Sequence, residues 1–241
     1  MQPISGELME PLPTVSKSHT FLYSHEFDFP FYEGSPVSSI GLLFAPRSGS
    51  TLLGCLMRQS FALGFPLEYF AAPNVSILAE RVEKYSLGNV SGLYRIRTSP
   101  NGVFSFKWKV ADGCHYKYSV LLDKLNPKRY IVMDREDKDA QARSFAIAKR
   151  TREWVLRRGS RGAEEAPKVL DEEIRRAKEE IEAEWNFIRI FCKKVSVPIM
   201  YVTYEQVLQD PENVVREVVD FCNVQTFEKI DITRVPIARQ S

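Results

Sequence analysis

The sequence predicts an α/β fold of three layers, in which a central, mainly parallel sheet is flanked by helices. Four short apolar runs, at residues 40–45, 103–110, 130–133 and 198–203, have the length and composition of buried strands. Segments with apolar residues at helical spacing alternate with these runs, and parallel strands need such crossovers. The chain has 241 residues, 44% of them hydrophobic, which is enough for one large domain with its own core.

Apolar spacing and turn residues place the helices between these strands. We expect a helix over 51–63 that ends at Gly64, where a C-cap glycine is favourable. Further helical spacing marks residues 74–87, 118–125, 138–158, 169–194 and 211–222. Gly159 and Gly162 are expected to end the helix that begins at 138, and the Pro-Asn-Gly of residues 100–102 predicts a turn before the second strand.

The first 39 residues differ in composition from the rest of the chain. They are rich in Pro, Ser and aromatic residues and show no sustained period, for example in Phe27-Asp-Phe-Pro-Phe-Tyr. We interpret residues 1–39 as an N-terminal arm whose aromatic side chains pack on a domain formed by residues 40–241. For residues 1–18, a flexible tail is an equally good interpretation.

Composition excludes several classes of function. A net charge of +2 with both signs mixed does not indicate a nucleic-acid surface. Four isolated cysteines and three scattered histidines predict neither a metal site nor a His-dependent triad, and the thiols fit a reduced, cytoplasmic protein. No apolar run approaches ~20 residues, so we expect no membrane span.

The stretch from Pro46 to Leu53, Pro-Arg-Ser-Gly-Ser-Thr-Leu-Leu, joins the first predicted strand to the first predicted helix. A loop in this position directs backbone N–H groups and the positive end of the helix dipole at one point, which favours an anion. Additional donors come from Arg47, Ser48, Ser50 and Thr51, and Gly49 permits close approach of the backbone. The loop is P-loop-like, but Ser50 stands where a P-loop has its Lys. A capped turn that binds nothing is the alternative.

A second candidate anion site follows the third predicted strand. Arg135 lies at its carboxyl end, and Ser144 lies two turns into the next helix. Both side chains can face one crevice and hold one phosphate, because ligands of parallel sheets bind beyond the carboxyl ends of the strands. The alternative for Arg135 is a surface ion pair with Asp139.

Taken together, these residues resemble the bacterial trehalose-sulfotransferase family, whose donor is 3′-phosphoadenosine 5′-phosphosulfate. Four blocks carry the resemblance, in order and with similar spacing over about residues 40–223. They are Pro46-Arg-Ser-Gly-Ser-Thr-Leu-Leu; Gly64-Phe-Pro-Leu-Glu-Tyr-Phe; Pro100-Asn-Gly-Val-Phe with Lys107; and Arg135 with Gln141, Ser144, Thr151 and Trp154.

The resemblance implies roles for these residues. The loop Arg47, Ser48, Gly49, Ser50, Thr51 and Leu52 would hold the 5′-phosphosulfate, and Arg135 with Ser144 the 3′-phosphate. Glu68 would be the general base on the acceptor hydroxyl, and Arg47 would stabilise the charge that develops on the leaving phosphate. Lys107 would be a third catalytic residue that points into the polar crevice, and no metal would take part. Glu68, Tyr69, Phe70 and Trp154 would contact the acceptor.

Each assignment has an ordinary alternative. Glu68 can be a solvated loop carboxylate, and Lys107 can extend its stem to the sheet edge. Tyr69, Phe70 and Trp154 would look the same as core aromatics. The segment 71–99, where acceptor recognition is expected, departs from the family pattern, so the acceptor need not be trehalose.

The sequence therefore predicts an enzyme that transfers a sulfuryl group from this donor to a hydroxyl of a carbohydrate, a glycolipid or a related metabolite. Two other functions stay open. One is a phosphotransferase of the kinase type, and the other is a non-catalytic nucleotide-binding module. A homodimer is also left open.

Overall fold

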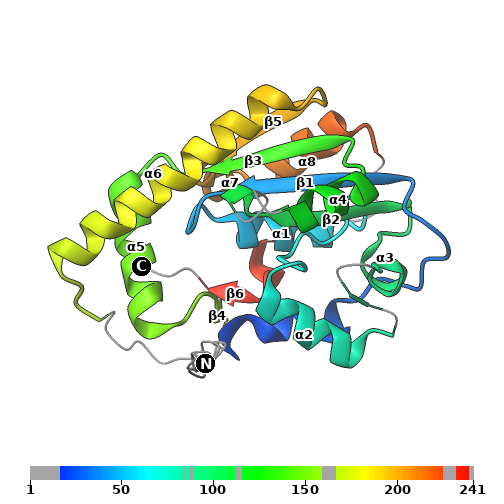
Figure 1. Ribbon diagram of the computed structural model, residues 1–241, viewed down its shortest axis with the longest axis horizontal. Coiled ribbons are helices and arrows are strands. Elements are labelled where there is room, and N and C mark those ends of the chain that lie inside the picture. The colour runs from blue at the N-terminus through cyan, green and yellow to red at the C-terminus, as the bar shows by residue number, and fades with distance from the viewer. Residues whose placement is uncertain are drawn as a thin grey trace, which may run out of the picture.

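Four parallel strands form the central sheet in the computed structural model, which describes residues 17–83, 85–86, 89–111, 116–158, 167–224 and 232–238 (Figure 1). The strands are β1 (Ser38–Phe44), β2 (Val103–Trp108), β3 (Arg129–Asp134) and β5 (Ile199–Thr203), and their order is β2-β1-β3-β5. All three strand pairs are parallel. The predicted α/β fold with a parallel sheet flanked by helices is confirmed.

Helices cover both faces of the sheet. The ring of Phe191 on α6 packs edge-on against Tyr130 of β3, whereas the side chain of the preceding Arg129 donates to the Phe221 carbonyl of α8. Neighbouring strand residues point to opposite faces, so α6 and α8 lie on opposite sides of the sheet. Helix α1 contacts α8 and shares its side.

The helices in chain order are α1 (Ser50–Gln59), α2 (Ala72–Arg81), α3 (Ser91–Arg97), α4 (Tyr116–Leu125), α5 (Lys138–Thr151), α6 (Asp171–Lys194), α7 (Tyr204–Gln209) and α8 (Pro211–Cys222). The described residues also include the 3-10 helices η1 (Lys17–Tyr23), η2 (His25–Phe27) and η4 (Ile232–Arg234). Strands β4 (Leu156–Arg157) and β6 (Ile237–Ala238) form a short antiparallel ladder beside the main sheet.

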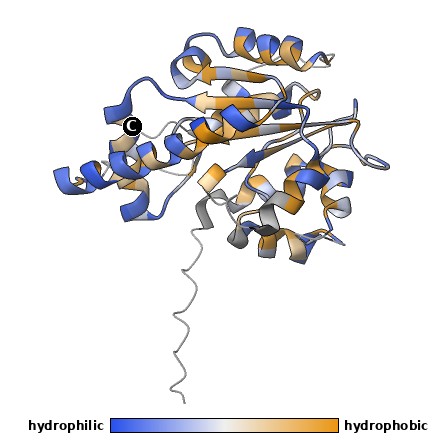
Figure 2. Cartoon of the chain, turned by 45° about the horizontal axis from the view of Figure 1, so that its top comes forward, coloured by the Kyte–Doolittle hydropathy of each residue, from blue (hydrophilic) through white to orange (hydrophobic). Residues whose placement is uncertain are grey.

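The core follows the apolar pattern of the sequence. Leu42, Leu43, Ile131 and Val132 on the central strands have no exposed surface, and the strands are largely in the hydrophobic colour in Figure 2. Burying a side chain of this size stabilises the fold by about 1.5–3 kcal/mol. The sheet is thus a rigid base for the loops at its carboxyl edge.

The start of the described chain belongs to this core. Leu22, Tyr23 and Phe29 are 2–4% exposed, and Phe29 packs edge-on against Phe61. Aromatic packing expected of the N-terminal arm is therefore present for the described part of residues 1–39. The domain boundary at residue 40 stays an expectation.

Three predicted helix ends were wrong. The helix expected over 74–87 is α2, which ends at Arg81 because Val82 has an extended backbone. Helix α1 ends at Gln59, because Ser60 donates its hydroxyl to the Met57 carbonyl and Phe61 adopts a left-handed φ of 53°. Helix α5 ends at Thr151, where Arg152 takes a left-handed φ of 58°. Gly159 and Gly162, expected to end this helix, lie outside the described residues.

Candidate active site

The loop between β1 and α1 turns through two residues with left-handed backbone. Arg47 has φ 63° and Gly49 has φ 89°. The side-chain amide of Gln141 on α5 donates to the Pro46 carbonyl at 2.8 Å. The loop is thus held by a helix that lies far from it in the sequence.

The start of α1 presents hydrogen-bond donors without helical acceptors. The Leu53 N–H donates to the Gly49 carbonyl at 3.1 Å, so the N–H groups of residues 50–52 precede the first bond of the helix. Ser48 has no exposed surface, and its hydroxyl has no hydrogen-bond partner within the described ranges. A buried hydroxyl without a partner is costly. An anion seated on the loop would supply the missing acceptor.

Arg47 reaches across from the loop to the segment around α5. Its Nε donates to the Ser144 hydroxyl at 3.0 Å, and a second N–H donates to the Trp154 carbonyl. Burial and, to a lesser extent, the nearby Arg135 cation lower the pKa of Arg47 to about 10. Two cations held this close make an anion more favourable between them.

Arg135 lies one residue beyond β3. Its guanidinium stands 4.8 Å from the centre of the Tyr204 ring, and its Nε is buried with no acceptor in the part of the chain that the structure describes. Asp139, the expected ion-pair partner in the ordinary alternative, instead pairs with Lys178 at 2.5 Å. Arg135 therefore keeps a donor for a ligand.

Glu68 and Lys107 form an ion pair beside the start of α1. The Lys107 Nζ donates to the Glu68 Oε1 at 2.8 Å and to the Thr51 hydroxyl at 3.2 Å. The Lys107 ammonium also lies 4.3 Å from the centre of the Phe44 ring. The Lys107 side chain is 4% exposed and that of Glu68 is 38% exposed. A buried cation thus links the loop to a carboxylate that solvent or a ligand can reach.

The backbone around Glu68 is fixed on both sides. The Lys107 N–H donates to the Leu67 carbonyl at 2.9 Å, so residues 64–68 run beside β2. On the other side, the Asn74 amide donates to the Glu68 carbonyl at 2.7 Å. The carboxylate therefore stands on a braced segment, as a general base needs.

The three aromatic residues predicted to contact the acceptor lie in different surroundings. Tyr69 has no exposed surface and donates its hydroxyl to the Phe65 carbonyl. Phe70 is 3% exposed and packs on Phe106. Both rings belong to the core and present no face to a ligand, which corrects the expectation that they contact the acceptor. Trp154 is 37% exposed and lies beside the Arg47 contact.

Two further residues shape the site without having been assigned a role from the sequence. Gln141 holds the loop, and the Tyr204 ring lies under Arg135. The position of Tyr204 directly after a buried parallel strand is a usable signal, because it places the residue at the carboxyl edge. Nothing in the local pattern points to the loop contact of Gln141.

Two classes of feature are missing from the ranges that the structure describes. They hold no group of three or more His, Cys, Asp or Glu side chains arranged to bind a metal ion. Their helices include none with the length and apolar character needed to cross a membrane.

Comparisons with known proteins give likenesses of structure only. No family model matches the chain, and no curated protein sequence matches it. Among solved structures, the sulfotransferase domain of the Synechococcus PCC 7002 olefin synthase aligns with a TM-score of 0.49 and 16% identity. The alignment covers 84% of this chain and 78% of that one.

Proposed function

We propose that this protein is a sulfotransferase that moves a sulfuryl group from 3′-phosphoadenosine 5′-phosphosulfate to a hydroxyl of an acceptor. The observation that carries the proposal is the Lys107 ammonium, which binds both the Glu68 carboxylate and Thr51 at the start of α1. It joins a candidate base to an anion-binding loop. A capped turn that binds nothing has no need of such a link.

The residues of the loop fit the donor's 5′ end. The buried Ser48 hydroxyl lacks an acceptor among the described residues, and the N–H groups of residues 50–52 lie at the positive end of the α1 dipole. A phosphosulfate group supplies several acceptor oxygens at one place. Ser50 in place of the P-loop Lys fits a donor that has no β,γ-phosphate pair.

A second phosphate fits between Arg135 and the pair of Arg47 and Ser144. The Arg135 Nε lacks an acceptor in the described chain, and Arg47 already holds the Ser144 hydroxyl at 3.0 Å. This is the place that the donor's 3′-phosphate would take. A bound dianion there would stabilise both guanidinium charges.

The chemistry divides among the residues of the ion pair and the loop. When bound, the donor supplies the sulfuryl group and a phosphate as leaving group. Glu68 takes the proton of the acceptor hydroxyl as its oxygen bonds to sulfur and the bond from sulfur to the bridging phosphate oxygen breaks. Lys107 holds the carboxylate in place. The Lys107 ammonium, Arg47 and the loop N–H groups stabilise the charge that develops on the leaving phosphate.

The acceptor is a hydroxylated small molecule in this proposal. The resemblance implies a carbohydrate, a glycolipid or a related metabolite, and the site itself requires a hydroxyl within reach of Glu68. Cys55, Cys192 and Cys222 are free thiols, which fits a protein that works in the cytoplasm.

Titration calorimetry with adenosine 3′,5′-bisphosphate and with ADP tests the proposal. We expect the bisphosphate to bind at least about tenfold more tightly than ADP, with or without Mg²⁺, since a bidentate phosphate contact is worth about 1–3 kcal/mol. Arg135→Ala should bind both ligands with similar affinity. Arg143→Ala is the matched control, because Arg143 is an exposed arginine on the same helix α5. Preference for ADP or a need for Mg²⁺ would instead support a phosphotransferase.

A further inference from the structure

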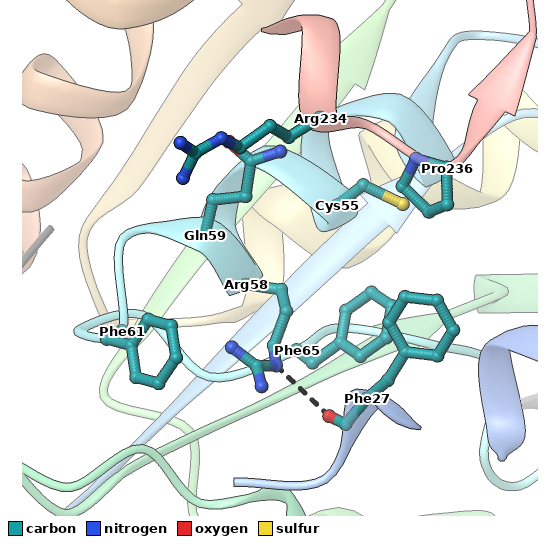
Figure 3. A pocket seen from close by; sticks show the side chains of 8 residues that line it. All are labelled: Phe27, Cys55, Arg58, Gln59, Phe61, Phe65, Arg234 and Pro236. Atoms are coloured by element: carbon teal, nitrogen blue, oxygen red, sulfur yellow. Dashed lines mark hydrogen bonds between the residues drawn. The ribbon is translucent and has the colours of Figure 1, made fainter. Parts of the chain in front are cut away.

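A cavity of about 190 Å³ lies beside the C-terminal half of α1 (Figure 3). Its walls are mostly apolar. The rings of Phe27, Phe61 and Phe65 form one side, and the Cys55 thiol and Pro236 form another. These residues come from η2, the segment after α1, α1 itself and the turn before β6, so both ends of the described chain help to enclose it.

The polar side chains at this cavity are those of Arg58, Gln59 and Arg234, and hydrogen bonds to backbone carbonyls engage Arg58. The Arg58 guanidinium donates to the carbonyls of Phe27 and Asp28, each at 3.0 Å. The same group stands 4.0 Å from the centre of the Phe29 ring and 4.5 Å from that of Phe61. Gln59 and Arg234 complete the lining, and both side chains are drawn above Arg58 in Figure 3.

The cavity begins one helical turn from the candidate transfer centre. Thr51, which accepts from Lys107, and Cys55 lie four residues apart on α1 and therefore on one face of the helix, about 6 Å apart along its axis. Burial raises the pKa of the Cys55 thiol to about 12, and the positive charge of Lys107 offsets part of this rise. The Cys55 end of the cavity is thus the end nearer to Thr51 and Lys107.

Size and lining define what fits. A cavity of about 150 Å³ with apolar walls is large enough to bind benzene, so about 190 Å³ takes one substituted aromatic ring. Phenylalanine walls pack well against another ring. A sugar would bring several hydroxyls between walls formed mostly by apolar side chains, and each hydroxyl left without a partner there is costly.

We infer that this cavity receives the acceptor and that the acceptor is a phenol-type aryl alcohol rather than a free sugar. The inference rests on the proposed sulfotransferase function. The ring lies among Phe27, Phe61 and Phe65, with its hydroxyl at the Cys55 end, toward Glu68. Transfer then moves the phenolic proton to Glu68 and forms an aryl sulfate as the phosphate leaves.

Binding of 4-nitrophenol without any donor tests the cavity by itself. We expect wild-type protein to bind 4-nitrophenol in titration calorimetry and to show no binding of glucose at the same concentrations. Cys55→Leu places two more heavy atoms into the cavity and should weaken 4-nitrophenol binding at least about tenfold. Its affinity for adenosine 3′,5′-bisphosphate should stay within about twofold of wild type, because α1 binds that ligand at its other end.

Cys222→Leu on α8 is the matched control, since it makes the same change at a half-buried cysteine away from the cavity. It should leave both affinities unchanged. If Cys55→Leu does not fold, Phe61→Ala replaces it. That variant enlarges the cavity and should raise the affinity for 2-naphthol relative to 4-nitrophenol.

The outcomes separate the two proposals. If 4-nitrophenol binds, Cys55→Leu weakens that binding and the bisphosphate does not bind, the cavity is still a binding site for aryl alcohols but the sulfotransferase function is excluded. If the bisphosphate binds, three results would overturn the aryl acceptor. They are the absence of 4-nitrophenol binding, 4-nitrophenol binding that neither cavity variant alters, and glucose binding as tight as that of 4-nitrophenol. With donor and 4-nitrophenol together, we expect 4-nitrophenyl sulfate, and its formation should need Glu68.

Discussion

Glu68 and Lys107 show what can be predicted for single residues and what cannot. The block Pro66-Leu-Glu and the mid-strand position of Lys107 single out both residues. That they form one ion pair with Thr51 follows only from the way residues 64–68 run beside β2. A local pattern carries no information about which side chain a lysine meets across 39 residues.

Tyr69 and Phe70 are residues whose side-chain direction could not be predicted from the sequence. They follow Glu68 directly, so the sequence places all three at one site. The structure directs the Glu68 carboxylate outward and both rings into the core. In a helix or strand, sequence periodicity indicates which way a side chain points. An irregular segment has no such periodicity, so the direction depends on backbone geometry that the sequence does not reveal.

Glu68→Gln tests the residue that we propose as the base. We expect transfer with the best acceptor to fall about 10²–10⁴-fold, since this is the usual contribution of a general base. Affinity for adenosine 3′,5′-bisphosphate should stay within about threefold, because Gln still offers an oxygen to Lys107. Product formation at saturating donor measures the first, and calorimetry the second.

Glu83→Gln is the control for this substitution, because Glu83 is an exposed glutamate on the segment after α2. It should transfer sulfate at the wild-type rate. Transfer by Glu68→Gln at that same rate would exclude Glu68 as the base and leave the donor site to be explained on its own.

At the level of elements, strands were easier to predict than helix ends. All four strands of the main sheet match apolar runs in the sequence, because short β-branched and aromatic runs bounded by turn residues are typical of strands. The expectation that all four are buried was wrong for β5, which lies at the sheet edge with only Val202 buried. The ends of α1 and α5 depend on left-handed Phe61 and Arg152. Neither is a glycine, so neither gives a stop signal. The two-residue strands β4 and β6 are too short to have a period.

Gly49 lies between β1 and α1, and its conformation affects both the start of α1 and the candidate site. It has φ 89°, and a Cβ built there would lie 2.4 Å from Cδ2 of Tyr204. We expect Gly49→Ala to cost about 2–5 kcal/mol, from left-handed strain and overpacking together. It should also weaken bisphosphate binding, because the Tyr204 ring would have to move from under Arg135.

Gly34→Ala separates the two contributions. Gly34 has nearly the same φ, 91°, and a Cβ there would meet nothing within 4 Å. This variant should cost only the strain of about 1–2 kcal/mol and leave bisphosphate affinity unchanged. Urea unfolding of both variants measures the difference. An equal loss of stability in the two would show that the Tyr204 contact relaxes freely.

At the scale of the whole molecule, the parallel sheet explains why the residues of the proposed donor site could be grouped from the sequence. Its strands all end at one edge, so residues that follow β1 and β3, such as Arg47 and Arg135, must lie near each other. No comparable topological rule predicts the residues that line the cavity beside α1. Phe27 and Pro236 come from opposite ends of the described chain, and no local pattern indicates that they line the same cavity.

Arg97 fixes the N-terminal segment that supplies Phe27. It has no exposed surface, donates to the carbonyls of Leu22 and Ser24 at 3.3 and 3.1 Å, and pairs with Asp28 at 3.2 Å. Burial lowers the pKa of Arg97. A buried guanidinium with this many acceptors costs free energy to desolvate, and that cost is offset only while η1 and η2 stay in place.

Arg97→Met should therefore loosen one wall of the cavity while leaving the donor site intact. We expect a loss of about 3 kcal/mol in urea unfolding, because several buried carbonyls lose their donor. Affinity for 4-nitrophenol should fall at least about fivefold, and bisphosphate affinity should stay within about twofold. Arg95→Met, an exposed arginine on the same helix α3 that stacks on Phe31, should change neither affinity. Equal weakening of both ligands by Arg97→Met would mean that the segment supports the entire site, so that the acceptor side and the donor side are one cooperative unit.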